Sequence, residues 1–246
     1  MTRSFQTLIL LPLLAGALLS AAATPLKTKH DDFSAGDLNE SLWMPEMGPY
    51  QALFEFDGRL VLLRDPLCLD PDQTGIRIST FSKSEEAVQF DIRVSARVPR
   101  KIIAPWADFD DAVAVGLGFF VAERDDRFIG LLLEDSAAGR HFVRISGGGL
   151  GVDLKRIAVP ADAGSTVLLR VFRAPSGRLT FMWRKPEDTA WRKIFGGLPT
   201  STVSGAVGPS ILRPFLMGRA LGSVPCPPYW NVSLDNFTLN YQRAAD

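Results

Sequence analysis

The sequence predicts an all-β protein built as an antiparallel sandwich of two sheets. Apolar and polar residues alternate with period two in many short segments, and no segment after residue 23 keeps a helical period. The 21 glycines and 17 prolines supply turn signals along the whole chain. About a dozen short strands in about 220 residues favour antiparallel sheets over alternating strands and helices.

The strands follow one another along the chain with recognisable turns between them. A strong hairpin signal, Asp57-Gly58, separates Ala52–Phe56 from Arg59–Leu63. The other candidates are a hairpin of Val167–Arg173 and Arg178–Arg184 around Pro175-Ser176-Gly177, and the single strands Ile76–Phe81, Arg127–Leu133, His141–Ile145, Val152–Val159, Ile211–Met217 and Val232–Tyr241. The stretch Pro199–Pro209 is predicted to be a surface loop.

Two further segments alternate most clearly. In Val88–Val98 every second residue is apolar and the residues between them are polar, which predicts a strand with one buried face and one wet face. In Val113–Val121 bulky residues occupy every second position, which predicts a strand face with large side chains directed into the core. The other parity holds small residues: Ala114, Gly116 and Gly118.

The composition limits the classes of partner. The 246 residues carry 27 Lys and Arg against 27 Asp and Glu, so no overall field would attract nucleic acid or an anionic membrane. With 46% hydrophobic residues the chain can bury a sizeable core. Two cysteines are too few for a disulfide-dense scaffold or a four-thiolate zinc site. This balance favours a neutral ligand held by hydrogen bonds and stacking.

The N-terminus has the pattern of a secretory signal peptide. Arg3 is positive, residues 8–19 form a short apolar run, and residues 21–23 are small alanines at which cleavage is expected. The run is too short to span a bilayer stably, although a retained anchor is the alternative. We therefore expect a signal peptide over 1–23, one domain over 24–246, and a secreted or periplasmic protein without stable membrane insertion.

Export would place the two cysteines where disulfides persist. Cys68 and Cys226 are therefore expected to pair, closing a long loop that contributes at most about 5 kcal/mol in the chain-entropy model. Two unpaired thiols are the alternative, because the sequence does not reveal their separation.

The two ends of the chain carry a family resemblance. The chain opens with 31–34 (DDFS), Trp43 and 56–60 (FDGRL), and it closes with 232–239 (VSLDNFTL). With alternating strands between them, these ends resemble the concanavalin A-like lectin/glucanase superfamily, including laminin G-like modules and jelly rolls attached to glycosidases, over about residues 31–241. The resemblance implies a jelly roll of two packed antiparallel sheets, one of them concave, with the first and last strands adjacent.

The closing segment changes parity in its middle. Trp230, Val232 and Leu234 lie on one parity, and the apolar residues that follow lie on the other: Phe237, Leu239 and Tyr241. A bulge at Asp235-Asn236 is predicted, because it would turn both triplets toward the core.

No catalytic motif is evident, although this superfamily contains enzymes as well as lectins and adhesion modules. Its glucanases lead one to look for Glu-x-Asp-x-Glu on one strand, and the sequence has no such stretch. The acidic pairs that remain are interpreted as solvated turn charges: Glu55 with Asp57, Glu123 with Asp125, and Glu134 with Asp135. His141 is expected to be an ordinary strand histidine, so we expect no catalytic residues.

Ligand binding is the better-supported chemistry. On the wet face of Val88–Val98, the candidate binding residues are Gln89, Asp91, Arg93 and Arg97. If this strand neighbours Val113–Val121, they would rim a shallow floor of small residues that suits a sugar chain. An ordinary polar sheet face is the alternative. Tyr229 and Trp230, in a proline-rich loop, are candidates for stacking on sugar rings, and other aromatics lie near Pro or Gly: Trp43, Tyr50 and Trp106.

A structural calcium ion is a further expectation. Asp31, Asp32 and Asp235 would converge if the first and last strands are adjacent, and calcium prefers oxygen ligands. The alternative is that these carboxylates cap turns or bulges.

The sequence therefore favours an exported, noncatalytic, lectin-like carbohydrate-binding domain with a glycan or polysaccharide as its partner. One alternative is a polysaccharide-active hydrolase or lyase whose carboxylates converge only in the fold. Another is a structural or adhesion domain that binds protein.

Overall fold

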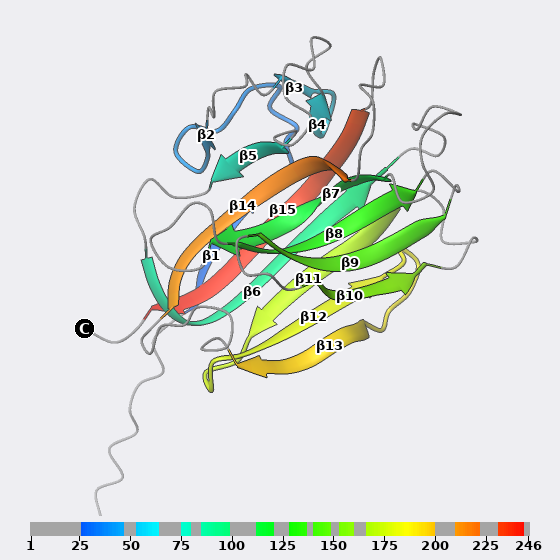
Figure 1. Ribbon diagram of the computed structural model, residues 1–246. Helices are drawn as coiled ribbons and strands as arrows, with labels where there is room; N and C mark the ends of the chain where they lie inside the picture. Colours follow the sequence, from blue (N-terminus) through cyan, green and yellow to red (C-terminus); the bar gives the residue numbers. More distant parts are fainter. Residues whose placement is uncertain are drawn as a thin grey trace, which may run out of the picture.

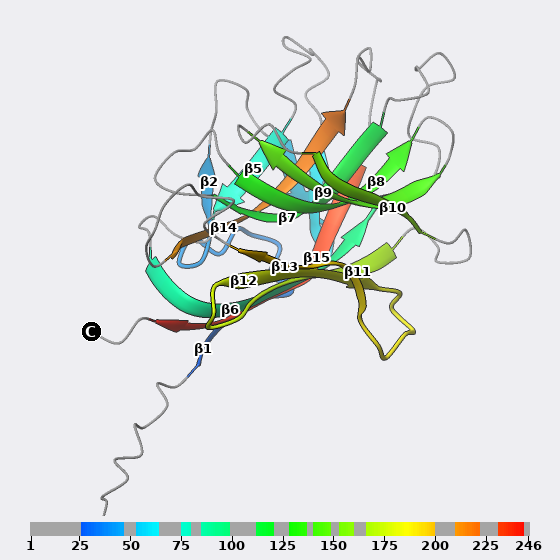
Figure 2. The ribbon, with the colours of Figure 1, turned by 60° about the horizontal axis from the view of Figure 1, so that its bottom comes forward.

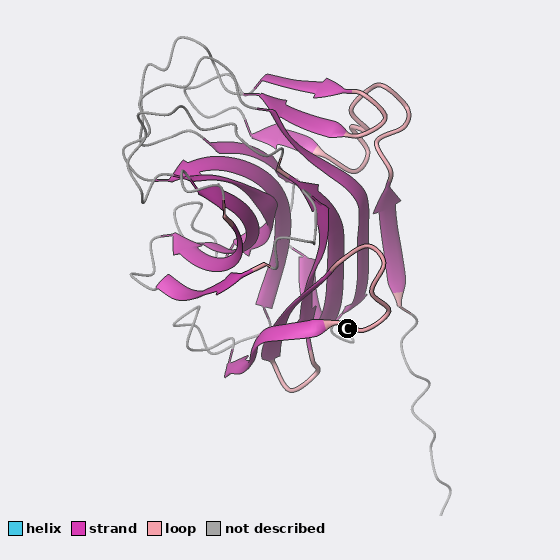
Figure 3. Ribbon diagram, turned by 90° about the vertical axis from the view of Figure 1, so that its right-hand side faces the viewer, coloured by secondary structure: helices cyan, strands magenta, loops and turns pink. Residues whose placement is uncertain are grey.

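A computed structural model describes fifteen strands and several of their connections. The described residues are 26–46, 53–63, 75–79, 85–98, 112–120, 128–136, 140–148, 153–159, 166–199, 210–221 and 231–243. Regular structure within these ranges consists of strands (Figure 3). Among these residues no helix has the length and apolar character needed to cross a membrane. The expected signal peptide and the expected Cys68–Cys226 disulfide lie outside the described residues.

The strands form two antiparallel sheets that lie face to face (Figures 1 and 2). Sheet A contains β1 (Lys27–Asp31), β3 (Leu53–Phe56), β4 (Leu60–Leu63), β6 (Glu85–Arg97), β11 (Thr166–Arg173), β12 (Arg178–Arg184), β13 (Arg192–Pro199) and β15 (Asn231–Arg243). Sheet B contains β2 (Met44–Glu46), β5 (Gly75–Ser79), β7 (Ala112–Phe120), β8 (Phe128–Ser136), β9 (His141–Gly148), β10 (Asp153–Ala158) and most of β14 (Ser210–Leu221). The predicted all-β, two-sheet antiparallel jelly-roll sandwich is confirmed.

Strand β14 connects the two sheets. Its first residues, Ser210–Leu212, pair with β6 of sheet A, and the rest of the strand pairs with β7 of sheet B. The strand is strongly curved in Figure 1, which lets it pass from one layer to the other.

The two ends of the chain meet as expected. Strand β1 pairs with β15 along its whole length, so the first and last strands are adjacent. The register of β15 against β6 shifts between Asp235 and Thr238, and Asn236 has a φ of 52°. Leu234 and Phe237 are both fully buried on either side of this irregularity. The predicted bulge is confirmed.

The core lies between the sheets. Burial alternates along β6, and Phe90, Ile92 and Val94 are at most 1% exposed. They belong to a single cluster that also takes residues from sheet B, among them Val115, Leu117, Leu131 and Ile145. Trp183 also belongs to this core, as expected.

Trp43 closes one end of the core rather than standing exposed in a loop. It is 2% exposed, and its ring centroid lies 4.8 Å from that of Phe237 and 5.7 Å from that of Phe33. Its indole N–H donates to Asp31 Oδ2 at 2.7 Å. Trp43 is therefore not available to a ligand.

The prediction that the strands Val88–Val98 and Val113–Val121 are neighbours is wrong. Strand β6 lies between β11 and β15, whereas β7 lies between β14 and β8 in the other sheet. The small outer residues of β7 therefore do not form a floor beside Asp91. Ala114 is fully buried, and a Cβ at Gly116 would collide with the backbone of Leu131 in the neighbouring strand β8. Small residues at these positions allow β7 and β8 to lie close together.

Three strands carry little sequence signal. β1 reads KTKHD, an edge strand with no apolar residue, and β2 has only three residues. In β13 the pairing with β12 shifts register twice, which interrupts the simple alternation that a prediction needs.

Candidate ligand-binding face of sheet A

The outer face of sheet A presents polar side chains from neighbouring strands. On β6 the core residues alternate with partly exposed polar residues, because successive side chains point to opposite faces. The pairing register places Thr238 and Asn240 of β15 on one side of Arg93 and Asp91. It places Arg170 and Phe172 of β11 on the other side.

Asp91 is held by two arginines. Arg170 donates from Nε to Oδ1 at 2.8 Å and from Nη2 to Oδ2 at 2.9 Å. Arg93 donates from Nη2 to Oδ2 at 2.5 Å and from Nε to Oδ1 at 3.3 Å. Both guanidinium groups thus bind the carboxylate in a bidentate manner, the strong and directional form of this contact.

The charge state of Asp91 follows from these contacts. Burial alone would raise the pKa of Asp91, but the hydrogen bonds and positive charges of Arg93 and Arg170 bring that pKa below its ordinary value. The carboxylate is therefore ionised at neutral pH. One negative charge stands between two positive charges, so the trio carries a net charge of about +1.

Aromatic rings flank Arg170. Its guanidinium carbon lies 5.5 Å from the ring centroid of Trp191 and 5.7 Å from that of Phe172. Arg184 also lies over Trp191, at 5.1 Å. These cation–π contacts restrict the guanidinium groups. We call Asp91, Arg93, Arg170, Arg184, Phe172 and Trp191 the Asp91 cluster.

The face continues across β15 to β1 with smaller polar groups. His30 Nδ1 lies 3.1 Å from Thr238 Oγ1, and the Thr28 hydroxyl donates to Asn240 Oδ1 at 2.8 Å. His30 and Thr28 are both exposed. The described part of the face is therefore a continuous strip of hydrogen-bonding groups from β1 to β11.

The structure brings together some of the predicted binding residues. Gln89, Asp91 and Arg93 lie on this one face, and Arg97 lies exposed toward the end of the same strand. Tyr229 and Trp230 lie outside the described residues, so their assignment stays a prediction.

Sequence reasoning missed the partners of Asp91. Arg170 occupies a polar position in the alternating strand β11, but nothing local indicates that β11 lies beside β6. Trp191 precedes β13 and has no neighbouring pattern that marks it. The pairing of β11 with β6 identifies Arg170, and the side-chain packing over Arg170 identifies Trp191.

The expected calcium ligands do not converge. Asp31 accepts bonds from the Phe33 backbone and from Trp43, and Asp235 accepts from the Asn236 backbone. Asp32 binds the Ser34 hydroxyl at 2.7 Å and its backbone N–H at 3.0 Å, and these bonds lower the pKa of Asp32. Within the described ranges no group of three or more His, Cys, Asp or Glu side chains could hold a metal ion. The three carboxylates serve local turns.

The interpretation of Glu134 and Asp135 as solvated turn charges is wrong. Both lie inside β8 and are 1% exposed. Asp135 Oδ1 lies 3.4 Å from His141 Nε2 on the core side, and Glu134 Oε2 lies 3.5 Å from Arg144 Nη1 on the outer side. These residues lie in the strand and not in a turn, because the pairing of β8 with β9 continues as far as Asp135 and His141.

Of the other acidic residues interpreted as turn charges, Glu55 lies in strand β3 rather than in a turn. Asp57 lies in the hairpin turn, as predicted. Glu123 and Asp125 lie outside the described residues.

These features define a class of protein by its fold. The chain is a jelly-roll sandwich of two antiparallel sheets. No family model matches it, and no curated protein sequence does. Solved structures do share its architecture.

Two of these structures are similar over nearly their whole length. The winged bean acidic lectin, complexed with methyl-α-D-galactose, has a TM-score of 0.57 at 8% identity and covers 89% of this chain and 100% of its own. The CBM2 module of the evolved Dit protein of Lactobacillus casei BL23 phage J-1 has a TM-score of 0.58 at 10% identity, covering 91% and 99%.

A third similar structure is much longer. The Bacteroides ovatus protein described as xyloglucan PUL GH43B has a TM-score of 0.57 at 14% identity over 87% of this chain. This chain spans only 39% of its length. At such low identities the three likenesses show the fold alone.

Proposed function

We propose that this protein is a noncatalytic carbohydrate-binding protein whose ligand lies across the outer face of sheet A. The observation that carries this proposal is the Asp91 cluster, in which two arginines share one carboxylate and one of them lies over Trp191. Side chains fixed in this way lose little freedom on binding, which favours affinity.

The chemistry of the face suits sugars. Sugar hydroxyls both donate and accept hydrogen bonds, and charged groups make the stronger bonds of this kind. Asp91 accepts, Arg93 donates, and the neighbouring Thr238 can do both. The lectin complexed with a galactose derivative has the same fold, which makes a saccharide ligand a natural choice.

Binding is favoured over hydrolysis by the arrangement of the described carboxylates. Hydrolysis of a glycosidic bond normally needs two carboxyl groups that flank it, one of them protonated as a general acid. Glu134 and Asp135 point to opposite faces of β8, so they do not flank one bond. Asp91, with its lowered pKa, is ionised at neutral pH and is a poor general acid.

The proposal includes export. Residues 1–23 would direct the chain out of the cytoplasm and be removed. Fractionation of the producing cells, with the mass of the extracellular or periplasmic protein, tests this point. A protein that keeps residues 1–23 or stays in the cytoplasm would contradict it.

The binding function is tested by affinity electrophoresis in gels that contain a broad panel of neutral and acidic polysaccharides. We expect at least one polysaccharide to retard the wild type. Arg93→Gln should abolish the retardation, because Arg93 is the more exposed of the two arginines on Asp91, at 42% against 20%. Arg140→Gln is the control, since Arg140 is an exposed arginine directly before β9 of sheet B and lies away from the outer face of sheet A.

Two results would refute the proposal. One is an absence of retardation by any polysaccharide in the panel. The other is the release of reducing ends or unsaturated sugars by the wild type, which would show an enzyme.

A further inference from the structure

We infer that the ligand is an acidic polysaccharide whose uronate carboxylates pair with cations across the outer face of sheet A. This inference rests on the proposed function and deepens it. It also departs from the neutral ligand that the overall charge balance favours, because the charge of one face differs from the charge of the whole chain.

The outer face of sheet A is locally basic. Pairing register and exposure place six basic residues on it: Arg93 and Arg97 of β6, Arg170 of β11, Arg178 and Arg184 of β12, and Lys193 of β13. Among the residues whose side chains the structure describes, the acidic ones that the same register places there are Asp91 and Asp235. This excess of positive charge is available to an anion.

The acids of the adjoining turn do not cancel that excess. Asp188 Oδ2 binds Arg192 Nη2 at 2.9 Å, and Glu187 lies 4.0 Å from the ammonium nitrogen of Lys185. Each of these acids thus has a basic partner outside the Asp91 cluster.

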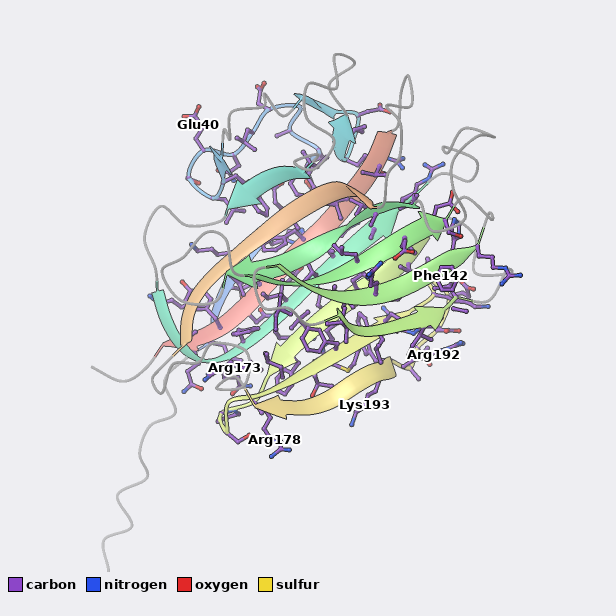
Figure 4. The ribbon with its side chains drawn as sticks, in the orientation of Figure 1. Glu40, Phe142, Arg173, Arg178, Arg192 and Lys193 are labelled. Carbon is purple, nitrogen blue, oxygen red and sulfur yellow. The ribbon has the colours of Figure 1, made fainter. Side chains whose placement is uncertain are left out.

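Three of these basic residues, Lys193, Arg170 and Arg93, lie in one row across the strands. The register aligns one residue from each of six neighbouring strands at one level: Lys193, Met182, Arg170, Arg93, Thr238 and His30. Neighbouring strands lie about 4.8 Å apart, so the row extends about 24 Å. Figure 4 shows Lys193 at one end of this row, projecting away from the protein. A linear ligand lying across the strands would meet repeated cations.

The two central arginines retain donors for such a ligand. Their bonds to Asp91 use Nε and Nη2, whereas a guanidinium group carries five N–H donors. The Nη1 amino groups are not used on Asp91. Because the trio keeps one excess positive charge, an anionic acceptor gains more here than a neutral hydroxyl does.

A carboxylate is the anion that this geometry favours. The Nε and Nη2 fork of each arginine is occupied by Asp91, and Nη1 with the second Nη2 hydrogen leaves each guanidinium a further fork that matches a planar carboxylate. Uronic acids present planar carboxylates at regular intervals along a chain.

The test uses polygalacturonate, alginate and hyaluronan, each paired with its carboxyl-reduced neutral form, in affinity electrophoresis and calorimetry. We expect at least one uronate polymer to bind at least about tenfold more tightly than its reduced form. Arg93→Gln and Arg170→Gln should each weaken that binding by about tenfold to a hundredfold, the range for one charge-assisted hydrogen bond. Arg140→Gln, which removes an exposed arginine away from this face, should bind as the wild type does.

Salt provides a second readout. Raising the ionic strength from about 0.1 M to about 1 M shortens the Debye length from about 10 Å to about 3 Å, so uronate binding should weaken markedly. Thermal melting of each variant checks that it is folded. If Arg170→Gln is unfolded, Arg93→Gln decides, since Arg93 is the more exposed.

The failures are distinguishable. If every reduced polymer binds as tightly as its uronate form, or only neutral glycans bind, the inference fails and the carbohydrate-binding function stands. If dextran sulfate binds as tightly as the uronates, and Arg140→Gln is as impaired as Arg93→Gln, the binding is general attraction to polyanions and the inference fails. If no saccharide binds, the proposed function fails as well.

Discussion

At the scale of single residues, Asp91 contributes both to the stability of the fold and to the geometry of the candidate site. It is 13% exposed at the side chain and accepts four hydrogen bonds from two arginines. Such bonds oppose the desolvation of the carboxylate, and without them Asp91 would be a poorly compensated charge on a crowded sheet face. The same bonds hold Arg93 and Arg170 in place for a ligand.

The contribution of Asp91 to stability should depend on pH. Because its folded pKa lies below the ordinary 3.8, the ionised form stabilises the folded state above about pH 5, and this stabilisation is lost as the pH falls through the folded value. At pH 7 we expect Asp91→Asn to lower the free energy of unfolding by about 1 to 2 kcal/mol. Urea unfolding from about pH 7 to about pH 3 measures the difference, which should shrink below about pH 4.

Asp37→Asn is the control for this series. Asp37 is exposed in the turns between β1 and β2, so its replacement should change the free energy of unfolding by less than about 0.5 kcal/mol. A difference between wild type and Asp91→Asn that stays constant down to about pH 3 would contradict the assigned role of Asp91.

At the scale of elements, strand β15 depends on its bulge. A strand reverses the facing of its side chains at every residue, so the apolar triplet after Asn236 would face solvent without the extra residue. Asn236 takes a φ of 52°, a left-handed conformation that Asn and Gly tolerate better than other residues. Its backbone N–H donates to Asp235 Oδ1 at 2.7 Å.

Replacement of Asn236 tests this element. Asn236→Val should lower the free energy of unfolding by about 1 to 2 kcal/mol, because a β-branched residue is strained at this φ. Asn236→Gly keeps the backbone hydrogen bond without that strain and should stay within about 0.5 kcal/mol of the wild type. Asn236 is exposed, so lost packing would not explain a difference. Equal stabilities of the two variants in urea unfolding would show that the bulge carries no such constraint.

At the scale of the whole molecule, the side chains packed between the two sheets stabilise the fold, and the side chains on the outer face of sheet A form the candidate site. The two sets of side chains are separate because successive residues of a strand point to opposite faces of the sheet. Phe181 of β12 is fully buried between the sheets, whereas Phe172 of the neighbouring strand β11 is only partly buried on the outer face.

This division gives a matched pair of phenylalanines. Phe181→Ala should cost about 3 to 5 kcal/mol, because it leaves a cavity in the core. For a domain of this size the loss corresponds to a fall of about 6 to 20 °C in Tm. Phe172→Ala should cost only about 1 kcal/mol. Differential scanning calorimetry compares the two, and equal losses would mean that the two faces do not differ as described.

The sequence by itself determined the features that depend on near neighbours. Alternation defined the strands β6, β7 and β11, the Asp57-Gly58 turn defined a hairpin, and the change of parity at Asp235 defined the bulge. Asp91 and Arg93 were identifiable as site candidates for the same reason, since they occupy the polar positions of one amphipathic strand.

The tertiary structure alone decided which strands became neighbours. Nothing in β6 indicates that β11 and β15, rather than β7, lie beside it, because pairing depends on how the whole chain buries its apolar faces at once. That choice brought Arg170 and Trp191 to Asp91, and it buried Glu134 and Asp135 inside β8. Local periodicity determines which way a side chain points, whereas packing of the entire sandwich determines what it meets.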